Sequence, residues 1–198
     1  MSSETVRAFI AIFPPPEVQA ALDAAIAPVR GRGDGVAWIA AANLHVTLRF
    51  LGDLEPPQVD AACRAVAAAA SASAGPFAVA TGAVGAFPGP ARPRILWIGA
   101  REGAAPLVAL AARVEKALAR EGVTPAEKPF TPHLTVGRVR AAGTGAPASL
   151  AAARFLALTI PPQRFDVRTI ALVHSTLAPG GARYAPIAEA ALIAPASS

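Results

Sequence analysis

The feature that most constrains the fold of this chain is a short pattern that occurs twice, 88 residues apart. Residues 44–50 (LHVTLRF) and 132–138 (PHLTVGR) both carry His-x-Thr-x inside an apolar, strand-like segment. Side chains alternate along a strand, so the His and Thr of each segment share one face. Because the separation is close to half of the 198 residues, we expect two similar lobes that each contribute one such strand to a shared cleft.

The apolar periodicity predicts the same order of elements around both copies of the pattern. A strand is predicted over 6–13, a helix over 17–29, strands over 36–39 and 44–51, and a helix over 56–73. The second cycle has strands over 77–87, 95–100 and 133–139, with helices over 106–121 and near 149–156. Two final strands, over 165–177 and 184–192, are expected to form a hairpin around residues 179–181.

Composition excludes several classes of protein. Hydrophobic residues make up 54% of the chain and the mean hydropathy is +0.44, but we find no apolar run of 18 residues free of charge or proline. The start of the chain lacks the basic and long apolar regions of a signal peptide, so we expect a cytoplasmic protein without membrane contact. A single cysteine, Cys63, excludes an intramolecular disulfide, and without HExxH or CxxC spacing we expect neither a metal nor a cofactor.

The formal net charge of +5 is carried almost wholly by arginine, since Lys116 and Lys128 are the only lysines. This skew has two explanations that composition cannot separate. A GC-rich genome would raise Ala, Arg, Gly and Pro together, without functional meaning. Alternatively, the planar guanidinium group suits phosphate, and an arginine-rich basic protein favours an anionic partner such as nucleic acid.

Two histidines that face one another across a cleft can divide the work of a phosphoryl displacement. One neutral imidazole takes a proton from the attacking hydroxyl or water, and the other, protonated, gives a proton to the departing oxygen. The two threonine hydroxyls can donate hydrogen bonds to the non-bridging phosphate oxygens. A single His-x-Thr would carry no such meaning, because an isolated histidine is usually structural. A duplicate that uses His45 and His133, two of only three histidines, favours catalysis.

The chain resembles the 2H phosphoesterases, which are named for two such motifs, over nearly its whole length. The segments 43–52 and 130–138 are similar to the two motifs, 7–12 and 94–99 to the first and central strands, and 175–177 with Tyr184 to the terminal hairpin. Within that superfamily, the chain is most similar to the bacterial RNA 2′,3′-cyclic phosphodiesterases, also called 2′-5′ RNA ligases or LigT-like enzymes.

This resemblance implies an α+β fold of two pseudo-symmetric lobes, each an antiparallel sheet backed by helices, with the active-site cleft between them. We expect residues 1–198 to form one such bilobal domain and to act as a monomer. The implied reaction is hydrolysis of an RNA or nucleoside 2′,3′-cyclic phosphate to a 2′-phosphomonoester. His45 and His133 are the implied acid/base pair, by analogy with His45 as acid, and Thr47 and Thr135 hold the phosphate.

Phe50 follows His45 by five positions, and Arg138 follows His133 by five positions. Arg138 matches a phosphate-binding arginine of the family, but strict alternation would turn it away from the cleft. We therefore expect a bulge permitted by Gly137, or the end of the strand. Phe50 could stack on a nucleobase or belong to the core. Arg49, on the His face by alternation, is expected to contact a backbone phosphate or to be a solvated edge residue.

Several conspicuous residues have no assigned role. We expect His174, which lacks a threonine two positions later, to have a surface or core role. Arg92 and Arg94 could reach an RNA strand from their loop, or simply be solvated. Trp97 is expected in the core, and Trp38 either in the core or at the rim of the cleft.

Three functions are compatible with these residues. The leading hypothesis is a metal-independent cyclic phosphodiesterase, with 2′-5′ RNA ligation as a possible reverse reaction. A sibling activity of the same superfamily, such as cleavage of 2′-5′ oligonucleotides, is the alternative among enzymes. A module that binds RNA ends without catalysis is the alternative from another class, although binding alone calls for arginine rather than two titratable imidazoles.

Overall fold

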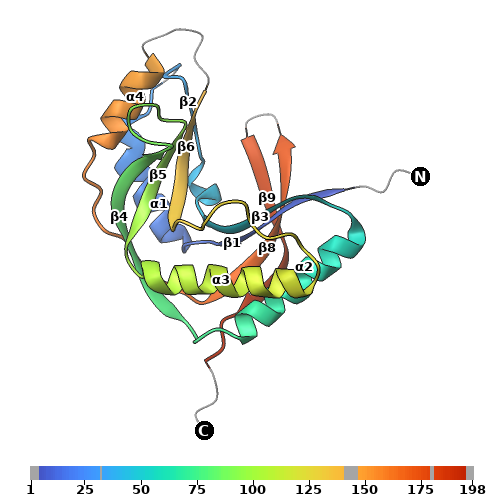
Figure 1. Cartoon of the computed structure of the whole chain (residues 1–198). Helices are drawn as coiled ribbons and strands as arrows, with labels where there is room; N and C mark the ends of the chain where they lie inside the picture. The colour runs from blue at the N-terminus through green and yellow to red at the C-terminus, as the bar shows by residue number, and fades with distance from the viewer. Residues whose placement is uncertain (1–4, 32, 141–146, 179–180, 195–198) are drawn as a thin grey trace.

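The computed structural model describes residues 5–31, 33–140, 147–178 and 181–194, and within them nine strands join in one antiparallel sheet (Figure 1). The main path of the sheet runs β7-β4-β5-β6-β3-β1-β8-β9, and β2 pairs with β6. The strands are β1 (Val6–Ile12), β2 (Val36–Trp38), β3 (Val46–Leu54), β4 (Phe77–Phe87), β5 (Ile95–Glu102), β6 (His133–Val139), β7 (Arg164–Val167), β8 (Thr169–Ala178) and β9 (Gly181–Ala191).

The sheet consists of two halves that meet at one recorded residue pair. β2, β4, β5, β6 and β7 form one half, and β1, β3, β8 and β9 form the other. Between them, β3 and β6 pair only at Val46 and Leu134. Figure 1 shows the β8–β9 hairpin and strands β5 and β6 on opposite sides of this junction. The expected α+β fold of two lobes is therefore confirmed, with both lobes built into one continuous sheet.

Within the described residues, four helices cover the sheet: α1 (Pro16–Ile26), α2 (Pro56–Ser71), α3 (Ala104–Arg120) and α4 (Pro147–Leu156), with the short 3₁₀ turns η1 (Ala27–Val29) and η2 (Ala41–Asn43). Proline at the first turn is tolerated in α1 and α2, since the first N–H groups of a helix have no partner within it. In α2, Glu55 and Gln58 form a reciprocal capping box. No helix in the described ranges is long and apolar enough to cross a membrane.

The apolar stripes predicted for the helices form the main core. In α3, Leu107, Leu110, Val114 and Leu118 are all buried, and they belong to one cluster with the aliphatic residues of β1, β3, β5 and β6. A smaller cluster lies on the other face of β1 and β8 and holds Phe9, Ala11, Ala171 and Val173, with Phe13 and Tyr184 packed against it. The sheet is therefore packed on one face by helices, while the other face keeps a small aromatic layer.

The prediction of one strand over 165–177 is wrong. The structure divides this segment into β7, which pairs with β4, and β8, which pairs with β1, with Arg168 between them. The side chains that face the core lie at odd positions in β7 (Phe165, Val167) and at even positions in β8 (Ile170, Leu172). Because residues 170–173 (IALV) are all apolar, the sequence does not reveal which of them face the main core, and this conceals the change of phase. Residues 179–180 of the predicted turn lie outside the described residues.

Candidate active site

The junction between the two sheet halves brings both His-Thr motifs together. β3 and β6 run antiparallel with Val46 opposite Leu134. In this register, His45 lies opposite Thr135, and Thr47 lies opposite His133. Val46 and Leu134 are buried in the main core, and the four polar side chains are half-buried on the opposite face. His45 directly precedes β3, which begins two residues later than predicted.

Both imidazoles are oriented in the same way by the backbone. Nδ1 of His45 lies 2.7 Å from the carbonyl oxygen of Asn43, and Nδ1 of His133 lies 2.7 Å from that of Thr131. A carbonyl oxygen only accepts hydrogen bonds, so each Nδ1 carries a proton and donates it. In the neutral ring, the other nitrogen, Nε2, is then unprotonated and available to exchange a proton with a ligand.

The surroundings lower the pKa of both histidines. For His45, burial is the main cause, opposed by the Asn43 carbonyl, and the charges of Arg138 and His133 lower the pKa further. For His133, burial again comes first, opposed by the Thr131 carbonyl, with a further lowering by Arg138. A charge on His133 disfavours a charge on His45, so protonation of both rings at once is disfavoured. One protonated and one neutral imidazole is the state that acid/base catalysis needs.

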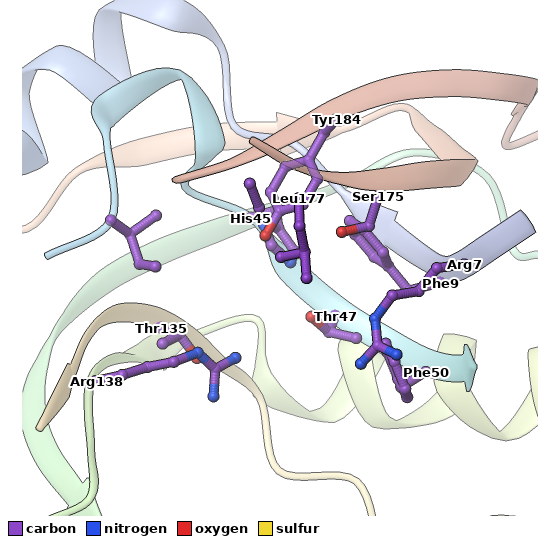
Figure 2. Close-up of a pocket in the computed structure, with 12 residues that line it drawn as sticks. Arg7, Phe9, His45, Thr47, Phe50, Thr135, Arg138, Ser175, Leu177 and Tyr184 are labelled. Carbon is purple, nitrogen blue, oxygen red and sulfur yellow. The ribbon is translucent and has the colours of Figure 1, made fainter. Parts of the chain in front are cut away.

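A cavity of about 430 Å³ opens beside these motifs (Figure 2). Figure 2 shows Thr135 and Arg138 on the β6 side, facing His45, Thr47 and Tyr184 across the space. Its lining residues are Arg7, Phe9, Ile39, His45, Thr47, Phe50, Thr135, Arg138, Ser175, Leu177, Ala182 and Tyr184. None of these is acidic, so the cavity suits an anion.

A bulge in each motif strand decides which later side chains reach this cavity. In β6, Thr135 pairs with Trp97 and Gly137 with Leu96, which leaves Val136 as an extra residue. In β3, Thr47 pairs with Ala11 and Arg49 with Ile10, which leaves Leu48 as the extra residue. Each bulge shifts the alternation by one position. Arg138 therefore lines the cavity, as the bulge expected near Gly137 would allow, and so does Phe50.

The expectation for Arg49 is corrected by the same bulge. Arg49 pairs with Ile10, whose side chain faces the helices, and does not line the cavity. Its Nη1 lies 3.0 Å from Oε1 of Glu115 on α3, and its Nη2 donates to the carbonyl oxygen of Thr124. Arg49 is thus neither a phosphate ligand of this cavity nor a solvated edge residue. It forms a structural ion pair with Glu115.

Aromatic rings enclose both histidines. The ring centroids of Phe9 and Tyr184 lie 4.8 and 5.3 Å from that of His45. The ring of Phe87 meets His133 edge-on at 5.0 Å. The sequence alone did not assign Phe9, Arg7 or Phe87 to the site. The alternation of β1 offered a signal for two of them, since Arg7, Phe9 and Ala11 follow a period of two.

The remaining residues singled out in the sequence lie elsewhere. His174 is half-buried on β8, paired with Ala8, outside the cavity. Trp38 packs against the main core and donates from Nε1 to Asp34 at 2.7 Å. Trp97 is half-buried beside Phe87 and His133 rather than within the core. Arg92 and Arg94 line a second cavity, together with His133.

Comparison with known proteins gives one consistent result. The model of the 2′-5′ RNA ligase superfamily matches residues 14–178. A protein of Aquifex aeolicus named RNA 2′,3′-cyclic phosphodiesterase is 33% identical over 153 residues, covering 77% of this chain and 79% of the relative. The Escherichia coli protein of the same name is 30% identical over 199 residues, covering 96% and 98%.

Solved structures agree with the sequence matches. The crystal structure of E. coli LigT complexed with 3′-AMP superimposes with a TM-score of 0.75 at 27% identity, covering 96% of this chain and 99% of that one. The crystal structure of a Thermus thermophilus protein, TT0787, gives a TM-score of 0.70 at 27% identity, with 94% and 97% covered.

Proposed function

This chain belongs to the 2′-5′ RNA ligase superfamily, and we propose that it is an enzyme that hydrolyses 2′,3′-cyclic phosphates, at RNA ends or on nucleosides, to 2′-phosphomonoesters. The observation that carries this proposal is the arrangement of two His-Thr pairs, one from each half of the sheet, around the junction of Val46 and Leu134. A site that only bound RNA would have no use for two imidazoles oriented through Nδ1.

In the proposed reaction, the cyclic phosphate lies between the two imidazoles. Nε2 of His133 accepts a proton from water as the water oxygen forms a bond to phosphorus. The bond from phosphorus to the 3′ oxygen breaks, and the departing 3′ oxygen takes a proton from Nε2 of His45, which leaves the phosphate on the 2′ oxygen. The product contains the water oxygen, His133 is now protonated and His45 is neutral. The pair regains its starting state when His133 releases its proton to the solvent and His45 takes one up. The assignment of His45 as acid follows the resemblance to the family.

Three further groups would stabilise the charge that develops on the phosphate. The hydroxyls of Thr47 and Thr135 donate to the non-bridging oxygens, and the guanidinium group of Arg138 supplies a bidentate positive partner. Each such donor is worth roughly 10²–10³ in rate when it is aimed at the transition state. A bound phosphate anion also raises the pKa of both histidines, which offsets the lowering by burial and by Arg138.

Phe50 and the neighbouring aromatic rings are proposed to receive the nucleoside. Phe50 is 51% exposed, and the guanidinium carbon of Arg7 lies 4.8 Å from its ring centroid. An exposed ring at the edge of a phosphate site is suited to stacking on a base. When a 5′ hydroxyl of RNA takes the place of water, the same chemistry would join two strands through a 2′-5′ linkage.

We also propose that residues 1–198 act as one bilobal domain, as a monomer, in the cytoplasm. Both halves of the continuous sheet contribute lining residues to the cavity, which supports a single domain. Sedimentation of the purified protein at several concentrations tests the monomer.

The test is incubation with 2′,3′-cyclic AMP in excess EDTA, followed by separation of the products. We expect 2′-AMP to accumulate while 3′-AMP does not. A double variant, His45→Ala with His133→Ala, purified in parallel, excludes a contaminating nuclease. Binding without turnover at any pH would instead indicate an RNA-binding module, and turnover of 2′-5′ oligoadenylate alone would indicate a sibling activity.

A further inference from the structure

A second cavity, of about 640 Å³, is lined by His133 of the candidate site. His133 is the first residue of β6 and lines this second cavity, whereas Thr135 and Arg138 of the same strand line the first. Residues of β6 therefore line both cavities, and His133 itself lines the second. We refer to the second cavity as the strand groove.

The strand groove carries three cations. Arg92, Arg94 and Lys128 line it, are exposed, and form no ion pair within the described part of the chain. No lining residue is acidic. Like charges gathered without a counter-charge repel one another, so an anion that lies among them gains binding free energy from all three.

The backbone fixes the base of this cluster. The N–H of Arg94 donates to the carbonyl oxygen of Phe87 at 2.8 Å, and the carbonyl oxygen of Arg94 accepts from Val139 at 2.9 Å. The first bond ties the loop to β4 and the second ties it to β6, the strand that begins at His133. The N–H of Arg92 donates to the carbonyl oxygen of Gly89 at 3.3 Å and tightens the loop. The cations are therefore anchored to the same strands as the catalytic centre.

The chemistry of the groove matches a single nucleic acid strand. Phe87 and Pro88 offer an apolar wall beside the three cations. Phosphates that alternate with flat bases are bound by such a combination of positive charge and aromatic surface. A nucleoside 2′,3′-cyclic phosphate has one phosphate, which the groups of the first cavity already hold. The strand groove therefore gains a ligand only when the substrate is longer than one nucleotide.

We propose that the strand groove binds the phosphates of the RNA strand that leads to the cyclic end, through Arg92, Arg94 and Lys128. This inference rests on the proposed function and narrows its substrate class to oligonucleotide ends. A bound strand lowers KM for oligonucleotides without altering the groups that act on the cyclic phosphate. The enzyme then prefers a short RNA to a mononucleotide, and the ratio of kcat/KM for the RNA to kcat/KM for the mononucleotide measures this preference.

The test compares two substrates, 2′,3′-cyclic AMP and a tetranucleotide that ends in a 2′,3′-cyclic phosphate. In the variant Arg92→Gln with Arg94→Gln, we expect the ratio of kcat/KM for the tetranucleotide to that for the mononucleotide to fall about tenfold. The slope of log kcat/KM for the tetranucleotide against log salt concentration should become less negative by about 1.4, because two fewer cations release counterions from the RNA phosphates. The matched control, Lys116→Gln with Arg120→Gln, removes the same charge from the exposed face of α3 and should leave the ratio unchanged.

A binding assay separates this proposal from the proposed function. Fluorescence anisotropy of a labelled tetranucleotide with a 2′-phosphate end needs no turnover. Weaker binding by the Arg92/Arg94 variant than by its control supports the strand groove, even if neither substrate is hydrolysed. Normal turnover with an unchanged substrate ratio and unchanged anisotropy would overturn the strand groove and leave the proposed function intact.

Discussion

Phe50 and Arg138 occupy equivalent places on the two halves of the sheet. Each stands five residues after a histidine, and in each strand one extra residue, Leu48 or Val136, turns the alternation so that the side chain enters the same cavity. The backbone repeat therefore extends beyond the His-Thr motifs, although the two side chains differ in chemistry. An aromatic ring on one half suits a base, and a guanidinium group on the other suits a phosphate.

Phe50→Ala should raise KM for 2′,3′-cyclic AMP about tenfold and leave kcat nearly unchanged, since base stacking on an aromatic ring is worth about 1–3 kcal/mol. Steady-state kinetics at a fixed pH measures both constants. Val108→Ala, which truncates another exposed apolar side chain on α3, is the control. A fall in kcat with unchanged KM would show that Phe50 does not hold the nucleoside.

Arg138→Gln should lower kcat about a hundredfold, because it removes a charged donor from the phosphate. The charge of Arg138 lowers the pKa of His45 and His133, so its loss should also move the acidic limb of the kcat/KM profile to higher pH. Arg138→Lys keeps the charge without the planar fork, and should restore the position of the limb while kcat stays low. An unmoved limb in Arg138→Gln would contradict the proximity of this charge to the histidines.

The pH dependence of stability should report on the same two histidines. Both have a pKa below the ordinary value of about 6.5, so the unfolded chain binds more protons than the folded chain as the pH falls through that value. The free energy of unfolding should therefore be fully retained above about pH 6.5 and decrease towards pH 5. Urea titrations at several pH values measure this slope. The double variant His45→Asn with His133→Asn should flatten it, and an equally steep slope in the variant would assign the effect to other groups.

Gly137→Ala should destabilise the fold by about 1–3 kcal/mol through overpacking. A Cβ at this position would lie 2.8 Å from Cγ1 of Val36 and 3.1 Å from Cε3 of Trp38, which belong to the neighbouring strand β2. Gly89→Ala is a matched control, because a Cβ there meets no described atom within 4 Å. Equal denaturation midpoints for both variants would show that β2 can shift to accommodate the added Cβ without loss of stability.

Much of the fold and of the site could be predicted because the sequence encodes local periodicity. The helix stripe of α3 and the repeated His-x-Thr are visible without a partner, since each depends on a spacing within one segment. The separation of His45 and His133 by nearly half the chain also indicated one contribution from each lobe.

The rest depends on which strand pairs with which. The bulges at Leu48 and Val136 are defined only against β1 and β5, so alternation alone assigned Arg49 to the cleft. Glu115, the partner that holds Arg49, comes from a helix 66 residues away. The break at Arg168 likewise becomes visible only when β7 and β8 pair with different strands.

The central claim is that His45 and His133 together transfer the protons of the reaction. The most direct measurement is kcat/KM for 2′,3′-cyclic AMP, in EDTA and across pH, with His45→Ala and His133→Ala measured separately and folding checked by circular dichroism. We predict a bell-shaped profile for the unaltered protein and a loss of about 10²–10⁴-fold in each variant. Undiminished kcat/KM in either folded variant would contradict the account.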